Sequence, residues 1–140
     1  MNKALDFFDK EKMTKLLYRK VLPLYPEFKA IKDMVITGHK KNIWEKTYHV
    51  VFEFKTVFID RDDREQVLPI FCTAHYNEPR KNVFESLQFL WQAGFSEGEL
   101  TIPRPLFYSE YYNGTFYRGV EGRDLYQYIR EKKLDKVSAI

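Results

Sequence analysis

The sequence has little cysteine, little glycine and only a small excess of positive charge. Cys72 is the single cysteine among 140 residues, which excludes an internal disulfide and a cysteine-rich zinc site. Six glycines are too few for several phosphate-cradling loops. The 23 basic and 20 acidic residues leave a net charge of +3, and a nucleic-acid-binding module usually carries a larger and more clustered basic excess. We therefore expect no nucleic-acid partner.

Long apolar runs are also missing. Charged residues interrupt every apolar stretch within a few positions, as Glu53 and Lys55 do, so the sequence predicts no membrane span. Residues 1–6 lack the apolar run and small residues of a signal peptide. We expect a cytoplasmic protein without a membrane partner.

Aromatic residues are abundant instead. Twelve Phe, ten Tyr and two Trp make up 17% of the chain, and hydrophobic residues make up 44%. The length suits one domain with a real core, and this composition favours a core of rings packed on a β-sheet.

The first predicted element is a helix that begins after Asp9 and ends before Pro23 and Pro26. Its apolar residues recur at helical spacing: Met13, Leu16, Leu17 and Val21. Its outer face is basic. A solvated face over a core stripe is commoner than a membrane-surface helix, and we favour it.

Three strands are predicted next. The first covers 34–36, ends at Gly38 and is followed by a polar turn at 39–42. The second shows clear period-two alternation, with one face formed by Tyr48, Val50, Phe52, Phe54, Thr56 and Phe58. A charged turn at 60–64 leads to the third strand, 67–74, in which Pro69 indicates an edge or a bulge.

The period then changes to that of a helix. Asn77 or Glu78 can cap it, and Gly94 fits the position just after its end. Two strands follow at 106–112 and 115–120, and Asn113-Gly114 between them is the preferred type I′ hairpin turn. A last helix is predicted to begin after Gly122 and to end at Lys132 and Lys133.

The short connections between strands predict an α+β fold with an antiparallel sheet. We expect five strands, with one helix before the sheet and one helix between the third and fourth strands.

This order, together with three stretches of sequence, resembles the N-terminal lobe of the aminoglycoside phosphotransferase and choline kinase-like superfamily, whose members are relatives of protein kinases. The three stretches are 74–80 with the following 89–95, then 102–108, and finally 117–125. The resemblance covers roughly residues 30 to 131. It divides the chain into a helical extension at 1–29, a kinase-like lobe at 30–122, and a helix and tail after the hinge at 123–140.

The resemblance implies that the chain binds ATP at defined positions. The backbone of Arg118, Gly119 and Val120 would form the hinge that hydrogen-bonds a purine, although a strand end before a capped helix explains these residues as well. The turn from Gly38 to Ile43 would lie over the phosphates, with one glycine where protein kinases have three.

The family's Lys–Glu pair would orient the α- and β-phosphates. Glu85 occupies the position of the glutamate, and a solvent-facing helical Glu is the alternative that we favour. Thr73 stands where the lysine is expected, with His75 two residues further on the same face. Neither residue replaces an ammonium, since threonine is neutral and histidine is mostly neutral at pH 7.

The superfamily's catalytic loop, His-x-Asp, and its metal-binding aspartate belong to a C-terminal lobe. No histidine here has an Asp two residues later. The letters of Asp60-Arg61-Asp62 match a D-x-D motif, but they fall in a predicted turn and are interpreted as solvated. We therefore expect no catalytic or metal-ligating residue in this chain, and Mg²⁺ only where a C-terminal lobe completes the site.

Two functions remain open. The chain is either the ATP-binding lobe of a small-molecule phosphotransferase, continued past Ile140 by a C-terminal lobe, or a non-catalytic lobe-like module that binds a nucleotide or a protein. Its partners would be a nucleotide and either the missing lobe or a second copy. Cys72 lies in an apolar strand and is interpreted as a core thiol, and the ring stripes are interpreted as sheet core rather than a nucleic-acid platform.

Overall fold

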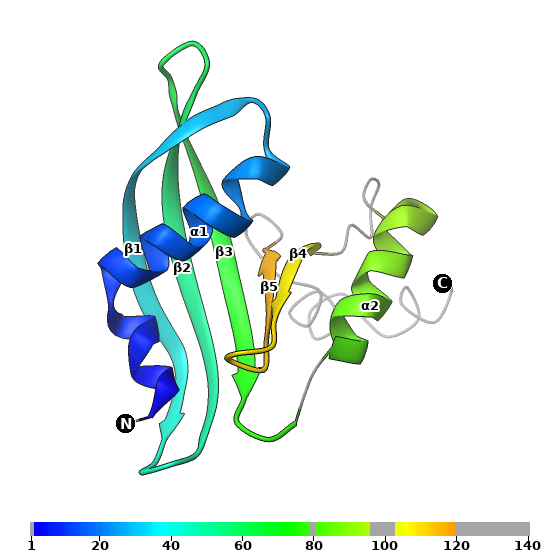
Figure 1. The fold of residues 1–140 in the computed structure, drawn as a ribbon. Helices are drawn as coiled ribbons and strands as arrows, with labels where there is room; N and C mark the ends of the chain where they lie inside the picture. Colours follow the sequence, from blue (N-terminus) through cyan, green and yellow to red (C-terminus); the bar gives the residue numbers. More distant parts are fainter. Residues whose placement is uncertain (1, 79–80, 96–102, 120–140) are drawn as a thin grey trace.

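The computed structural model describes residues 2–78, 81–95 and 103–119. Its centre is a five-stranded antiparallel sheet in the order β1-β2-β3-β5-β4 (Figure 1). The strands are β1 (Phe28–Ile43), β2 (Tyr48–Asp60), β3 (Glu65–His75), β4 (Arg104–Ser109) and β5 (Gly114–Arg118). Helix α2 (Lys81–Leu90) lies between β3 and β4 in the chain. The α+β fold and the position of this helix are as the sequence predicted.

The residues before the sheet form η1 (Lys3–Phe8), α1 (Lys10–Lys20) and η2 (Leu22–Leu24). Asp9 begins α1 as predicted, because its carboxylate accepts a hydrogen bond from the backbone N–H of Lys12 at 3.0 Å. Figure 1 shows α1 lying across the first three strands. Met13 and Leu17 are fully buried beneath it. The segment from η1 to η2 therefore completes the hydrophobic core of the sheet.

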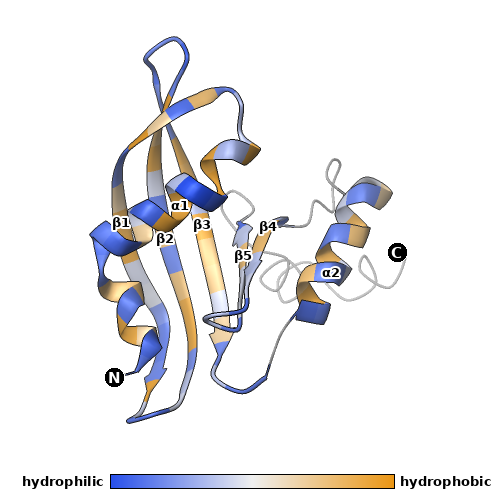
Figure 2. Ribbon diagram, viewed as in Figure 1, coloured by the Kyte–Doolittle hydropathy of each residue, from blue (hydrophilic) through white to orange (hydrophobic). Residues whose placement is uncertain are grey.

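The side of the sheet under α1 is the core face. Its residues on β2 alternate as predicted, and all six are buried: Tyr48, Val50, Phe52, Phe54, Thr56 and Phe58. Opposite them on β3 lie the buried side chains of Ile70, Cys72 and Ala74. The rings pack on one another, with Phe7 stacked on Phe52 at 5.2 Å between centroids. The alternating hydropathy along the strands is visible in Figure 2.

β1 is the main difference from the predicted fold. The sequence predicted a strand that ends at Gly38 and a turn at 39–42, but β1 continues to Ile43 and the chain turns between Trp44 and Thr47. The pairing skips one residue between Gly38 and Lys40, which is a β-bulge. The extra residue, His39, interrupts the period-two pattern, and for this reason the alternation was not visible in the sequence.

The connection from β2 to β3 is the predicted charged turn. The side chain of Asp60 accepts hydrogen bonds from the backbone N–H groups of Asp62 and Arg64, each at 2.9 Å. Pro69 lies in β3, where the pairing with β5 begins only at Ile70. The prediction of an edge or a bulge at Pro69 was wrong, because β3 is the central strand of the sheet and pairs with β2 through Pro69 without a register shift. The proline is tolerated because it lies just beyond the last residue pair between β3 and β5.

The connection from β4 to β5 differs from the predicted two-residue turn. Asn113 has φ 51°, but Gly114 does not have a positive φ and is the first residue of β5. Instead, Gly114 allows close packing: a Cβ there would lie 3.0 Å from the Cys72 sulfur and the Ala74 Cβ. The turn is longer because Tyr112 is buried within it, donating a hydrogen bond from its hydroxyl to Asp6 at 2.8 Å.

After α2, residues Trp91–Phe95 form a π-helical turn, and Gly94 has φ 110°, as its predicted place after the helix requires. The predicted last helix and Val120 lie outside the described residues. Within the described ranges, no helix is both long enough and apolar enough to span a bilayer.

Candidate functional site

The side of the sheet opposite the core face carries all three histidines of the chain, and we name it the histidine face. Strand alternation and pairing place the following residues on it: His39, Lys40, His49, Val51, Glu53, Phe71, Thr73, His75, Thr115 and Tyr117. Most of these side chains are half-buried, whereas the core-face residues of β2 from Tyr48 to Phe58 are all buried. The histidine face therefore combines polar groups and rings at an accessible surface.

One end of this face is a row of three stacked rings from three strands. The His39 ring stacks on Phe71 at 5.7 Å between centroids, and Phe71 stacks on Tyr117 at 5.6 Å with planes 10° apart. Glu53 lies beside this row, and its Oε1 is 2.8 Å from the Nε2 of His39. Planar ligands bind to such surfaces by stacking.

The other end of the face is basic. The ammonium of Lys40 is 3.2 Å from the Nδ1 of His49, and the rings of His49 and His75 are 5.0 Å apart. Because an ammonium can only donate, the Nδ1 of His49 accepts and the ring proton lies on Nε2. The backbone N–H of Asn77 donates to the Nδ1 of His75 at 3.4 Å and favours the same tautomer there. Two imidazoles and one ammonium thus gather at this end, which suits an anion.

Thr73 lies in the middle of the histidine face. It is opposite Val51 on β2 and Thr115 on β5, and its hydroxyl is 3.4 Å from that of Tyr117. Gly38, in contrast, is opposite Phe52 on the core face. A Cβ at Gly38 would lie 2.6 Å from side-chain carbons of Lys41, so this glycine permits close packing within the strand.

The two described residues of the predicted hinge follow the end of the ring row. The backbone N–H of Gly119 donates to the carbonyl of Pro69 at 2.9 Å, so this N–H already has a partner in the sheet. A Cβ at Gly119 would lie 2.5 Å from the Phe71 ring, so only glycine lets the ring rest on this backbone. The guanidinium of Arg118 is 6.0 Å from the centre of the Trp91 ring.

Glu85 lies on α2 in different surroundings from Thr73. It lines a groove of about 720 Å³ between α1, α2 and β4, together with residues such as Arg19, Lys20 and Phe107. Because α1 covers the core face and Thr73 belongs to the histidine face, the structure does not bring Thr73 and Glu85 together.

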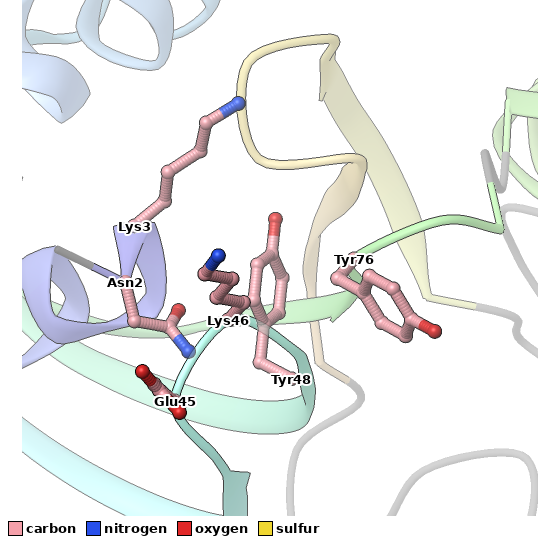
Figure 3. A pocket seen from close by; sticks show the side chains of 6 residues that line it. All are labelled: Asn2, Lys3, Glu45, Lys46, Tyr48 and Tyr76. Atoms are coloured by element: carbon pink, nitrogen blue, oxygen red, sulfur yellow. The ribbon is translucent and has the colours of Figure 1, made fainter.

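A smaller hollow of about 240 Å³ lies where the N-terminus meets the β1–β2 turn (Figure 3). The amide of Asn2 donates to the carbonyls of Trp44 and Thr47, and the ammonium of Lys3 donates to the carbonyl of Tyr111. The hydroxyl of Tyr48 donates to the carbonyl of Tyr112 at 2.7 Å. These hydrogen bonds fix the N-terminus to two turns, so the hollow has a structural role.

The buried thiol of Cys72 is not suited to act as a nucleophile. Burial raises the pKa of the Cys72 thiol well above its ordinary value, as expected for a core thiol. Within the described residues, no group of three His, Cys, Asp or Glu side chains could hold a metal ion.

Sequence reasoning missed Lys40 and the ring row. The sequence placed Lys40 in a turn, and only the bulge assigns it to a face. The ring row requires the pairing of β3 with β5, which are separated in the chain by α2, so local patterns cannot reveal it.

Comparisons with known proteins found no match: neither a protein-family model, nor a curated protein, nor a solved structure resembles this chain closely enough to identify it.

Proposed function

We propose that the chain is the nucleotide-binding N-terminal lobe of a small-molecule phosphotransferase of the aminoglycoside phosphotransferase and choline kinase-like kind, and that ATP binds on its histidine face. The observation that carries the proposal is the ring row His39–Phe71–Tyr117, whose middle ring, Phe71, packs against the backbone of Gly119. The sequence motifs independently assign Gly119 to the hinge that would hold the purine.

The purine would bind at the ring-row end. The rings of Phe71 and Tyr117 offer apolar surface for one side of a base, and stacking is worth about 1–3 kcal/mol per base. Main-chain groups at 118–120 would supply hydrogen bonds to the edge of the base. The N–H of Gly119 is already bonded to Pro69, so the remaining main-chain groups of this segment would make these contacts.

The phosphates would extend along β3 toward His75. His75 is four positions after Phe71, which corresponds to about 13 Å along a strand. This distance is comparable to the length of an extended nucleoside triphosphate. A nucleotide bound along it would place its phosphates at the basic groups of the face.

Phosphoryl transfer needs more than this lobe provides. It depends on positioning and on neutralising charge, for which the superfamily uses a His-x-Asp catalytic loop and a metal-binding aspartate, and no histidine of this sequence has an Asp two residues later. We therefore expect ATP binding without transfer by residues 1–140, and Mg²⁺ coordination only when a C-terminal lobe supplies the ligands.

The alternative is a non-catalytic lobe-like module that binds a nucleotide or a protein. Thr73 in place of the expected lysine favours this alternative. So does α2, which has no fully buried side chain and in which Phe89 is 71% exposed, because an apolar helix surface can bind a protein partner.

Calorimetric titration of the chain with ATP, ADP and adenosine tests the proposal. Phe71→Leu and Tyr117→Leu keep apolar bulk but remove the stacked ring, and each should weaken adenosine binding about tenfold, which corresponds to about 1.4 kcal/mol. Phe89→Leu on α2 is the matched control and should bind as the wild type does. Absence of saturable binding of both adenosine and ATP by the wild-type chain would refute the proposal.

A further inference from the structure

We propose that Lys40, brought onto the histidine face by the β1 bulge, supplies the phosphate-binding ammonium that β3 lacks at Thr73, and that the imidazoles of His49 and His75 complete this anion site. The inference rests on the proposed nucleotide binding and names the residues that would hold the phosphates.

The bulge is what places Lys40 on this face. Thr37 is opposite Glu53 and Gly38 is opposite Phe52, but the next pair is Lys40 with Val51. If the ladder continued without a bulge, His39 would be opposite Val51 and Lys40 opposite Val50, so Lys40 would point toward the core face, since a shift of one residue reverses every side chain. Bulges commonly re-aim a side chain in this way next to functional sites.

The register also aligns Lys40 with the position of the missing lysine. Lys40 is opposite Val51, and Val51 is opposite Thr73, so the three residues form one row across β1, β2 and β3. Adjacent strands are about 4.8 Å apart, which puts the backbone of Lys40 roughly 10 Å from that of Thr73. The long lysine side chain extends over β2, where its ammonium lies at His49, the residue opposite His75 on β3.

The environment of Lys40 differs from that of the two ion-paired lysines of β1 and from that of Lys41, which is exposed. Lys29 forms an ion pair with Asp63, and Lys32 forms one with Glu65 at 2.6 Å. Within the described part of the chain, no carboxylate lies within ion-pairing distance of the half-buried Lys40, and its ammonium contacts an imidazole instead. A half-buried cation without a counter-charge is the arrangement expected of a site whose anion comes from a ligand.

The neighbouring groups are suited to the same anion. An ammonium has three donors, and His49 occupies one, so two remain for phosphate oxygens. The rings of His49 and His75 lie side by side at 5.0 Å. The carboxylate of Glu53 is held at His39, toward the ring row, so the phosphates would bind at the Lys40 end of the face.

The decisive measurement is the ratio between ATP and adenosine affinity. In the wild-type chain, ATP should bind more tightly than adenosine. Lys40→Met should weaken ATP binding about tenfold or more and leave adenosine binding unchanged. Lys41→Met is the matched control, since the adjacent lysine is opposite Val50 on the other face and should retain the wild-type ratio. Thermal unfolding of each variant verifies that it is folded.

A second readout does not depend on a variant. In the imidazole nitrogen spectrum of the wild-type chain, the signals of His49 and His75 should shift with ATP but not with adenosine. An unchanged ATP-to-adenosine ratio in folded Lys40→Met, or unmoved signals of both histidines, would overturn the assignment of Lys40 and leave nucleotide binding intact. Failure of the wild-type chain to bind either ligand would instead overturn the proposed function and this inference with it.

Discussion

The two faces of the sheet are formed by the same strands but have different physical properties. On β2, Phe52 and Phe54 are fully buried among rings, whereas the intervening Glu53 is bonded to a histidine at a half-buried surface. Because side chains alternate with a period of two, each strand contributes to stability on one side and to possible binding on the other. Substitutions on the core face should therefore change the free energy of unfolding, and those on the histidine face should change binding.

Phe54→Ala on the core face should cause the largest change in the free energy of unfolding. Phe54 packs against the rings of Phe7, Phe52 and Phe116 and is fully buried. Removing it should lower the free energy of unfolding by about 3–5 kcal/mol, because the deletion loses apolar burial and leaves a cavity.

Phe71→Ala on the histidine face is the matched control for Phe54→Ala. Its ring is half-buried and should contribute less than half as much. Urea unfolding of both variants measures the two losses, and equal losses would contradict the division between the faces.

The sequence was sufficient to predict the core face, because β2 keeps strict alternation from Tyr48 to Phe58 and α1 keeps its apolar spacing. It was insufficient for β1, because the extra residue His39 reverses the alternation of the two faces along this strand. The polar residues after Gly38 therefore resemble a turn. The hairpin between β4 and β5 is confirmed, but the two-residue turn predicted at Asn113-Gly114 was wrong for a different reason: the burial of Tyr112, a tertiary contact, outweighs the local turn preference. Of the predicted site residues, Thr73 lies on the histidine face, but Lys40 required the register between strands.

Removing the Tyr112 hydroxyl at the edge of the core should have a smaller effect on stability. Tyr112→Phe removes the hydroxyl that donates to Asp6 at 2.8 Å and links the β4–β5 turn to the N-terminal helix. It should cost about 1–2 kcal/mol, because the hydrogen bond involves a carboxylate and Asp6 keeps its contact with Lys12. Chemical denaturation measures the loss. A larger loss, matching that of Phe54→Ala, would show that the turn itself depends on this bond.

We expect the protein to lose folding stability at alkaline pH because of Tyr48, whose hydroxyl bonds to the carbonyl of Tyr112. Burial is the main cause that raises the pKa of Tyr48 to about 12 from an ordinary value of 10.0. A pKa that is higher in the folded state gives stability that is complete below pH 10 and is lost as the pH rises from 10 to 12. The melting temperature should fall over this interval, and it should fall less in Tyr48→Phe. Parallel curves for the two proteins would show that Tyr48 does not ionise upon unfolding.

The smallest expected effect lies in the turn that belongs to neither face. Asp60 has a lowered pKa, first because of the hydrogen bond from the backbone of Arg64 and also because of that from Asp62. A lowered pKa in the folded state gives stability that is present above the ordinary value of 3.8 and is lost as the pH falls below it. Asp60→Asn keeps an acceptor without the charge, so its melting temperature should depend less on pH between 5 and 2.

Asp62→Asn in the same turn is the control, because the side chain of Asp60, and not that of Asp62, accepts the N–H groups of the turn. ATP binding should be unchanged in both variants, since the turn follows Phe58 and Ile59, at the end of β2 far from His49.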